Sequence, residues 1–281
     1  GQIDELTLES NQVTDQIRKK NVAVEYDRNG WGYFTLNTEG PHLSNKLVRQ
    51  ALTHAMDRGL ITRKLFGPLA KVPVGPIPSV SWAYDQNLKP LSHDSVKAIE
   101  LLEEAGYKLN GRGIYEKDGE PLSLRLGITD SPVLRNIASY VFVQYALIGI
   151  QVIIEPKSFA ELQTDMAAGD FDMVYTGFSL SLDPDSLYAL FHSSQFGAFN
   201  RSRYSNARVD ELLEAGRREA DPAKRKEIYA GVQQQLIEDA PVILLVSQHY
   251  TDWVSKKVKG GVRNFPGSGA SDYHLWWIFE Q

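Results

Sequence analysis

The chain has 281 residues, of which 42% are hydrophobic and 23% charged, and it contains no cysteine. This composition is typical of a globular protein, and the lack of cysteine excludes disulfides, thiolate metal sites and a cysteine nucleophile. The formal net charge of −5 offers no basic surface for nucleic acid, and no apolar run approaches the roughly 18 residues of a membrane helix. The sequence begins at Gly1-Gln2-Ile3-Asp4, which indicates a mature chain or an excised fragment.

Helical and strand-like segments mix along the chain. Helices are predicted where apolar residues recur every 3.6 residues or so, and strands where short apolar runs lie between turn residues. In chain order, the predicted helices cover residues 11–19, 43–66, 95–105, 134–145, 159–168, a segment beginning at 183, 207–218 and 222–238. The predicted strands cover residues 21–26, 31–37, 114–117, 122–128, 151–155, 171–178 and 242–246. Because the order shows no strict βαβ repeat, the sequence predicts an α/β fold with a mixed sheet and packed helices.

Turn and cap residues set the expected boundaries of these elements. Asn29-Gly30 and Asp118-Gly119 each predict a tight turn, so the strands on either side are expected to form two hairpins. Asp94 is expected to cap the helix that follows it. Gly67-Pro68 is expected to end the long second helix, and the three prolines within residues 73–78 predict an extended loop.

A polar stretch follows the predicted strand 171–178 and contains two carboxylates, Asp183 and Asp185. Two carboxyl groups in different environments can act as a general acid and a general base. The alternative is that Asp183, followed by Pro184, caps a helix, and that Asp185 meets the positive end of its dipole. We favour the cap, because aspartate is common at this position of a helix.

The other motifs do not predict catalysis. No two of the six histidines have the i, i+4 spacing of a helical zinc site, and the sequence contains neither a G-x-S-x-G elbow nor a phosphate-binding P-loop. In the segment GAFNRSRYSN, Arg201, Arg203 and Tyr204 could contact an anionic ligand. The segment could equally be a surface loop in which Asn206 caps the next helix.

Several segments together resemble a known family. In chain order they are YFTLNT, LVRQALTHAMDRGLI, PVGPIPSVSWAYD, VKAIELLEEAGY, FDMVYTGFSLSLDPDSLYALFHS and DPAKRKEIY, the last followed by APVILL. From about residue 3 onward, the chain resembles the family 5 extracytoplasmic solute-binding proteins, the peptide and nickel receptors of bacterial ABC importers. The V-R-Q-A-L-x-x-A-x-D-R pattern and the late D-P-A-K-R-K-E-I-Y pattern are specific in combination.

The resemblance covers part of the family's architecture, in which two lobes close on a ligand. It implies the second lobe of a type II periplasmic-binding-protein-like fold. Residues 1–36 are then a hinge-proximal segment belonging to a missing first lobe, residues 37–247 the C-terminal ligand-binding lobe, and residues 248–281 a tail that returns toward the first lobe. In that arrangement the tail residues Trp276, Trp277 and Phe279 are expected to be partly exposed.

The resemblance also implies a function. It predicts a non-catalytic receptor, periplasmic or membrane-anchored outside the cytoplasm, that binds a solute, by default a short peptide, and delivers it to an ABC permease. No cofactor, metal or nucleic acid is expected. Two alternatives remain open: the ligand-sensing domain of a transcriptional regulator, and a hydrolase that uses Asp183 and Asp185.

The expected ligand-binding residues follow from the same resemblance. In peptide-binding members, an Asp at the end of this strand holds the ligand's α-amino group, but the stretch FSLSL lacks it and is one residue shorter. Phe178, Ser179 and Ser181 occupy that neighbourhood instead. Arg135 matches an arginine that meets a ligand carboxylate in dipeptide receptors, although it could also be a solvated residue of a first helical turn.

Aromatic residues are expected to form walls of the cleft, because such walls bury ligand side chains without demanding a sequence. Tyr33, Trp82 and Tyr84 are the candidates, and Arg201 is a further candidate for an anionic group. Trp31 is also possible at this surface, but we favour a place for it in the core.

Overall fold

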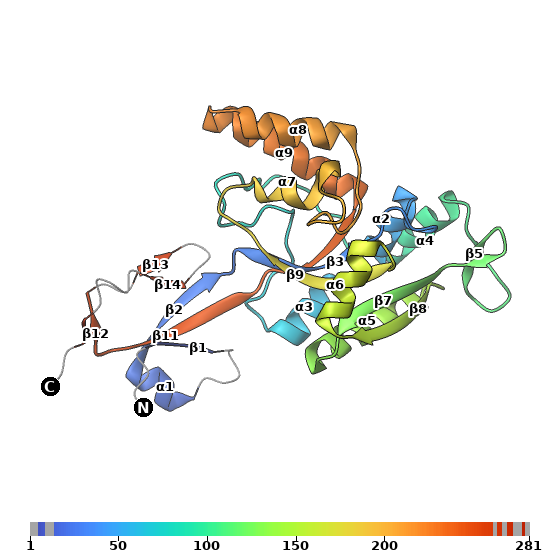
Figure 1. Ribbon diagram of the computed structural model, residues 1–281. Helices are drawn as coiled ribbons and strands as arrows, with labels where there is room; N and C mark the ends of the chain where they lie inside the picture. Colours follow the sequence, from blue (N-terminus) through green and yellow to red (C-terminus); the bar gives the residue numbers. More distant parts are fainter. Residues whose placement is uncertain (1–4, 9–13, 261–262, 266–268, 272–276, 279–281) are drawn as a thin grey trace.

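The computed structural model describes residues 5–8, 14–260, 263–265, 269–271 and 277–278, and two sheets of different size organise it (Figure 1). The large sheet has the strand order β10-β3-β9-β7-β8 and is mixed, since β7 runs parallel to β8 and β9 while β3 runs antiparallel to β9 and β10. Its strands are β3 (Gly30–Leu36), β7 (Ser123–Thr129), β8 (Gln151–Lys157), β9 (Met173–Ser179) and β10 (Val242–Val246). This arrangement confirms the predicted fold class.

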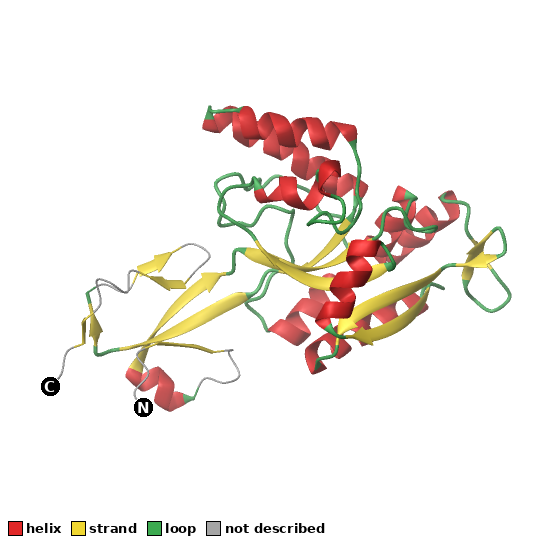
Figure 2. Ribbon diagram, viewed as in Figure 1, coloured by secondary structure: helices red, strands yellow, loops and turns green. Residues whose placement is uncertain are grey.

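Helices cover both faces of the large sheet. The helices of this lobe are α2 (Lys46–Ala55), α3 (Arg58–Phe66), α4 (Ser95–Glu104), α5 (Pro132–Ala146), α6 (Phe159–Ala168), α7 (Ser186–Phe191), α8 (Ala207–Arg218) and α9 (Pro222–Asp239). Figure 2 shows α3 and α5 below the sheet and α7 to α9 above it, in the view of Figure 1, while α6 crosses in front of the strands. Side chains alternate along β3 between the two faces of the sheet. Phe34 lies in the core between the sheet and helices α2, α3 and α5, whereas Trp31 and Tyr33 lie in the core between the sheet and helices α7, α8 and α9.

The small sheet has the order β1-β11-β2 and is antiparallel throughout. Its strands are β1 (Glu5–Leu8), β2 (Asn21–Asp27) and β11 (His249–Ser255), and the short helix α1 (Asp15–Lys20) precedes β2. Minor pairs complete the described chain: β4 (Lys108–Leu109), β5 (Tyr115–Lys117) and β6 (Glu120–Pro121) form one sheet, β12 (Val258–Lys259) pairs with β15 (Trp277–Ile278), and β13 (Arg263–Phe265) pairs with β14 (Gly269–Ser271).

The predicted hairpin at Asn29-Gly30 is wrong, because the chain passes from one sheet to the other there. β2 pairs with β11 in the small sheet, and β3 pairs with β9 and β10 in the large one. Asn29 and Gly30 lack the positive φ of a tight hairpin turn. The Asn29 side chain donates to Leu180 O at 2.6 Å, and a Cβ on Gly30 would clash with Phe178 O.

Three other predicted boundaries need correction. The long helix at 43–66 is two helices, since Asp57 accepts from Leu60 N at 2.8 Å and so caps a new helix, α3. The second hairpin is shorter than predicted: Asp118-Gly119 does form a tight turn with positive φ, but it joins β5 to β6, and β7 belongs to the large sheet. The helix predicted to begin at Asp183 begins at Ser186.

Most of the other helices agree with the sequence patterns. Asp94 caps α4 through Lys97 N, as predicted, and α6 covers the predicted residues 159–168. Within the described ranges, no helix is long and apolar enough to cross a membrane. Trp277 is 55% exposed, as expected for the tail, whereas Trp276 and Phe279 lie outside the described residues.

Candidate functional site

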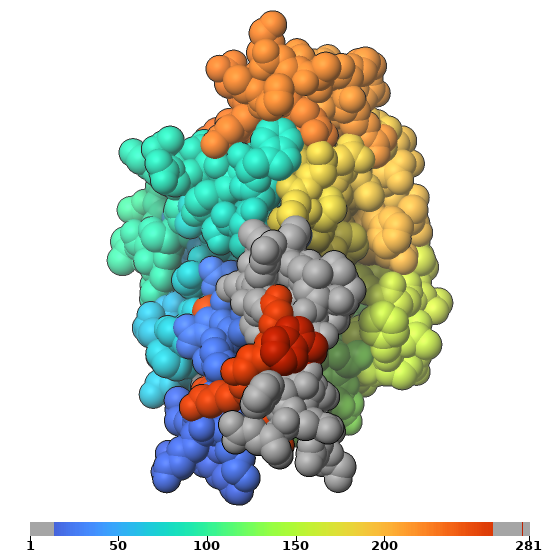
Figure 3. Space-filling view, turned by 90° about the vertical axis from the view of Figure 1, so that its left-hand side faces the viewer, coloured from blue at the N-terminus to red at the C-terminus, as the bar shows by residue number. Residues whose placement is uncertain are grey.

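The candidate site lies at the edge of the large sheet that faces the small sheet. β7 and β9 end at this edge and β3 begins there, as the pairing of Gly30 with Ser179 shows. Ligands of open α/β sheets bind beyond the carboxyl ends of the strands, where connections diverge. In Figure 3, which faces this edge, the proline-rich loop in cyan meets the yellow segment after β9; there the Ser81 hydroxyl donates to Leu182 O at 2.6 Å.

A first hollow lies on the sheet surface between β3, β9 and β10 and contains about 360 Å³ of empty space, part of it open to solvent. Its lining residues are Arg28, Gly30, Trp31, Gly32, Tyr175, Gly177, Phe178, Val246 and Gln248. The three glycines differ in what covers them: Phe178 O lies close to Gly30 and the Tyr175 hydroxyl lies close to Gly32, whereas Gly177 leaves the sheet surface open toward the described residues. Arg28 and Gln248 come from the two connections between the sheets.

A second hollow adjoins the first and lies under the proline-rich loop. It contains about 440 Å³ of empty space, and its lining includes Tyr84, Trp31 and Lys71. Trp31 is 4% exposed, and its indole N–H donates to Pro76 O at 3.1 Å, so the favoured core position is where the structure places it. Of the three favoured aromatic candidates, Tyr33, Trp82 and Tyr84, Tyr84 lines this hollow, and the largely buried Trp31 lines it too.

The Asp27 carboxylate at the rim of the second hollow is held by two basic groups. His249 Nδ1 lies 2.9 Å from one oxygen and Lys71 Nζ 2.8 Å from the other. Burial alone would raise the pKa of Asp27, but the contacts with His249 and Lys71 outweigh burial and keep this pKa below its usual value. Asp27 therefore remains charged. Its contacts with His249 on β11 and with Lys71 at the start of the proline-rich loop connect the end of β2 to both segments.

Phe178, Ser179 and Ser181 have different environments. Ser179 is exposed at the end of β9, and its hydroxyl accepts from Arg28 Nη2 at 3.1 Å. Phe178 is half-buried and packs edge-on against Phe199, with ring centroids 6.0 Å apart. The Ser181 hydroxyl donates to Asp183 O at 2.6 Å, so it stabilises the turn before α7.

Asp183 and Asp185 form bidentate ion pairs. Asp183 accepts from Arg225 at 2.6 and 2.8 Å, and Asp185 accepts from Arg217 at 2.6 and 2.9 Å. The predicted cap at Asp183 is wrong, because its carboxylate instead binds Arg225 and Asp185 N, and α7 starts after Asp185 without a side-chain cap. The hydrogen bonds from Arg225 lower the pKa of Asp183, which makes it a poor proton donor at neutral pH.

The remaining predicted residues are dispersed. Arg135 is exposed, and its Nε and Nη2 both donate to Asp130. Tyr33 is 5% exposed beneath α7 to α9, and it shares a small space with Arg201, whose Nη2 donates to Gln163 Oε1 at 3.3 Å. Trp82 is 40% exposed, and the Arg225 guanidinium lies 5.3 Å from its ring centroid. The structure therefore brings Phe178 and Ser179 together with Arg28 and places Tyr84 in the adjoining hollow, whereas Arg135, Tyr33, Arg201, Trp82 and Ser181 line neither hollow.

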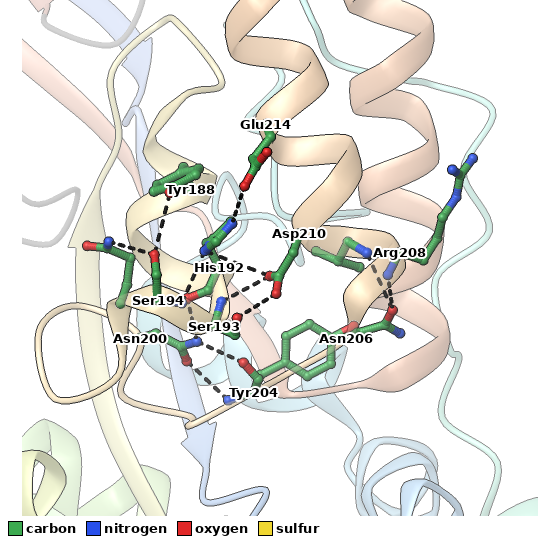
Figure 4. A network of polar contacts seen from close by, with 12 residues as sticks. Tyr188, His192, Ser193, Ser194, Asn200, Tyr204, Asn206, Arg208, Asp210 and Glu214 are labelled. Atoms are coloured by element: carbon green, nitrogen blue, oxygen red, sulfur yellow. Dashed lines mark hydrogen bonds and ion pairs between the residues drawn. The ribbon is translucent and has the colours of Figure 1, made fainter.

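A polar network holds the segment between α7 and α8 in place (Figure 4). His192 Nδ1 accepts from Ser194 N at 3.1 Å, and Ser193 donates to the Asp210 carboxylate through its backbone N–H and its hydroxyl. The buried Asn200 side chain donates to His192 O and Tyr204 O. This network fixes the loop that carries Phe199 and Arg201.

Arg28, Gly32, Tyr175 and Gly177 line the first hollow but are not among the residues predicted from the sequence. A signal for the glycines exists in the strand Gly30–Leu36, where Gly30 and Gly32 stand two residues apart and therefore on one face. No local pattern indicates Arg28, because its partners lie about 150 and 220 residues away in the chain, at Ser179, Gln248 and Tyr250.

Comparison with known proteins identifies relatives. The family described as bacterial extracellular solute-binding proteins, family 5 Middle, matches residues 1–198. The oligopeptide-binding protein AppA of Bacillus subtilis is 32% identical over 269 residues, which cover 92% of this chain and 48% of that protein. Protein XP55 of Streptomyces lividans is 30% identical, over 85% of this chain and 44% of that protein. The chain thus spans about half the length of these curated relatives.

Solved structures agree with this result. The Bacillus subtilis AppA structure, in complex with a nonapeptide, matches with a TM-score of 0.84 and 28% identity over 99% of this chain and 56% of that chain. Helicobacter pylori DppA in complex with the peptide STSA matches with a TM-score of 0.77 and 26% identity, over 98% of this chain and 52% of that one. Campylobacter jejuni NikZ in complex with Ni(L-His), at 24% identity and a TM-score of 0.82 over 98% of this chain and 57% of that one, shares the fold.

Proposed function

The chain belongs to the family 5 bacterial extracellular solute-binding proteins, and on this premise we propose that the complete protein is a receptor that binds a short peptide between two lobes. The large sheet and its helices form one lobe. The small sheet and the tail, which lie within the predicted segments 1–36 and 248–281, pack against the other lobe. The end of the first segment is an exception, because β3 (Gly30–Leu36) is a central strand of the large sheet. The bound peptide is then presented to an ABC permease on the outer side of the membrane.

The observation that carries this proposal is the pair of adjacent connections between the two sheets. The chain enters the large lobe at Arg28-Asn29 and leaves it at Ser247-Gln248, and Arg28 N donates to Gln248 O at 2.9 Å. Two short segments that lie side by side can serve as a hinge, because a few dihedral changes in each rotate one lobe against the other. A ligand that contacts both lobes then stabilises the closed state.

Peptide is the favoured ligand because AppA, the relative with 32% identity, is named an oligopeptide-binding protein and its structure holds a nonapeptide. NikZ holds Ni(L-His) on the same fold, so the fold alone does not decide the ligand. A non-catalytic role is supported by Asp183 and Asp185, since arginines engage both carboxylates in the alternative hydrolytic pair.

The test is to release co-purified small molecules from the complete protein by denaturation and to identify them by mass spectrometry. Calorimetry with a panel of short peptides then measures their affinity. We expect short peptides in the released fraction and dissociation constants at or below the micromolar range. A single non-peptide species, with no peptide binding, would overturn the peptide assignment, and turnover of panel peptides would restore the hydrolase alternative.

A further inference from the structure

Arg28 carries a positive charge that no carboxylate within the described residues neutralises. Its Nη1 donates to Gln248 Oε1 at 3.1 Å and to Tyr250 Oη at 3.2 Å, and its Nη2 donates to Ser179 Oγ at 3.1 Å. All three acceptors are neutral. Nη1 thus donates twice and Nη2 once, so two of the five N–H groups of the guanidinium remain available.

Three other arginines of the large lobe differ from Arg28 in this respect. Arg135 is paired with Asp130, Arg217 with Asp185 and Arg225 with Asp183, each through two hydrogen bonds. Asp27, the residue next to Arg28, is engaged by Lys71 and His249. The guanidinium of Arg28 is therefore held in place by neutral partners while its charge stays available to a ligand.

The glycine surface beneath Arg28 gives a ligand room to approach. Gly32 and Gly177 are directly opposite each other on β3 and β9. A Cβ on Gly32 would meet the hydroxyl of Tyr175, so this glycine lets the Tyr175 ring lie along the sheet. Among the described residues, a Cβ on Gly177 would meet only Trp31 O, at 3.8 Å, so these residues leave the space above Gly177 open.

The Tyr175 hydroxyl is a second donor in the same hollow. Burial raises the pKa of Tyr175, so the hydroxyl keeps its proton at neutral pH. Across the residues that the structure describes, this hydroxyl has no hydrogen-bond partner. The Tyr175 ring packs edge-on against the Phe34 ring, with ring centroids 5.2 Å apart. The partly buried ring packs against the core and so holds the hydroxyl at the hollow, while the O–H group stays available as a donor.

We propose that this hollow binds a carboxylate of the ligand, with Arg28 as the charged partner and Tyr175 as a neutral donor. A guanidinium suits a carboxylate because it offers two parallel N–H groups, and charge-assisted hydrogen bonds are about twice as strong as neutral ones. The inference rests on the proposed function and narrows it to solutes that carry an anionic group. The carboxylate can be the carboxyl terminus of a peptide or the side chain of an Asp or Glu residue.

The experiment uses calorimetry on the complete protein with matched peptides. One peptide has a free carboxyl terminus, a second has the same sequence with a terminal amide, and a third replaces a Glu of the sequence by Gln. We expect at least one replacement to weaken binding about tenfold or more, because it removes the anionic partner of Arg28. The peptide that loses affinity identifies the source of the carboxylate.

Arg28→Gln is then expected to weaken binding of the carboxylate peptide about tenfold to a hundredfold. The ratio of the affinities for the carboxylate peptide and the neutral peptide should then fall to a value near one. The ratio between the two peptides is the informative quantity, since a disturbed hinge lowers both affinities together. Arg208→Gln is the matched control, because Arg208 is an exposed arginine of α8, 3.7 Å from Glu211.

Gly177→Leu provides an independent test that retains Arg28. Its side chain would fill the hollow without a backbone clash, so we expect it too to abolish the preference for the carboxylate peptide. Gly111→Leu is the control, because a Cβ at Gly111 meets nothing within 4 Å.

The two proposals fail in different ways. If peptides bind but amidation and the Glu→Gln change both leave the affinity unchanged, or if Arg28→Gln leaves the ratio unchanged, the carboxylate site is wrong and the peptide receptor stands. If no peptide of the panel binds at all, the peptide proposal is wrong, and the carboxylate site is withdrawn with it.

Discussion

The large lobe and the small sheet are built from the same chain but differ in how they bury apolar surface. On each face of the large sheet lies a core with fully buried large side chains, such as Phe34 and Tyr145 on one side and Tyr229 on the other. The small sheet has a cluster of three described residues, Val24, Val254 and Val258. The large lobe therefore carries its own core, whereas the described side chains of the small sheet form a much smaller apolar cluster.

This difference indicates where each part takes its stability from. Apolar burial is the dominant favourable term in folding, and it acts on both faces of the large sheet. A small sheet needs a hydrophobic face or a packed helix to be stable by itself. In β2, Val22 is 48% exposed and Val24 is 8% exposed, so the face that carries both residues is covered at Val24 and open at Val22. We expect the small sheet to depend on the large lobe and, in the complete protein, on the other lobe.

The largest expected loss of unfolding free energy comes from truncating a core side chain in the large lobe. Phe34→Ala removes a fully buried ring that contacts Tyr175 and the core beneath the helices, and a change of this kind costs about 3–5 kcal/mol of unfolding free energy. Urea unfolding measures this loss. A loss below about 1 kcal/mol would contradict the conclusion that the large lobe carries its own core. Phe159→Ala is the control, because Phe159 is 65% exposed.

A smaller effect is expected from the ion pair between Asp183 and Arg225 within the large lobe. Because the folded protein lowers the pKa of Asp183 from 3.8, the pair contributes stability above about pH 4, and this contribution is lost as the pH falls through the folded pKa. The Asp183 side chain is 44% exposed, so solvent screening limits the contribution to about 1 kcal/mol or less.

Asp183→Asn should therefore be less stable than the wild-type protein at pH 7, and the difference should vanish at acid pH. Thermal unfolding of both proteins between pH 2 and pH 7 tests this. A difference that stays constant with pH would show that the carboxylate charge is not what stabilises the fold. Glu211→Gln, at a carboxylate 71% exposed, controls for the loss of a surface charge.

The smallest effect is expected in the small sheet. Val22→Ala should change the unfolding free energy by less than about 0.5 kcal/mol, because Val22 is half exposed. Val254→Ala should cost more, since Val254 is fully buried. Hydrogen exchange sharpens the comparison, with amides of β2 and β11 expected to exchange faster than those of β3 and β9. Equal protection of both sheets would refute the distinction.

Elements defined by local signals could be predicted from the sequence. Ser158 and Glu161 form a capping box that starts α6, and Asp221 with Pro222 starts α9. The buried strand β10 was clear from its apolar run, and Gly169 ends α6 in a left-handed conformation. In these cases the residues that decide the boundary are neighbours in the chain.

Features that depend on distant partners could not be predicted. Asn29-Gly30 has the composition of a hairpin turn, but β2 finds its partner in β11, whose Tyr250 pairs with Tyr26. Asp183-Pro184 has the composition of a helix start, but Arg225 on α9 takes the carboxylate. At the candidate site the sequence and the resemblance indicated the end of β9, while Arg28 became visible only once its neighbours were in place.

The position of the two connections between the sheets also bears on the order of folding. β2 and β11 are joined side by side, yet Asp27 and His249, which contact each other, are 222 residues apart. Closing so long a loop without the intervening structure is entropically costly, and folding of the large lobe brings its two ends together. During synthesis, β2 emerges before the large lobe, and its partner β11 emerges only after it. The large lobe is therefore an insertion between two neighbouring strands, and β2 lacks its partner β11, and is prone to association with other chains, while the large lobe is being synthesised.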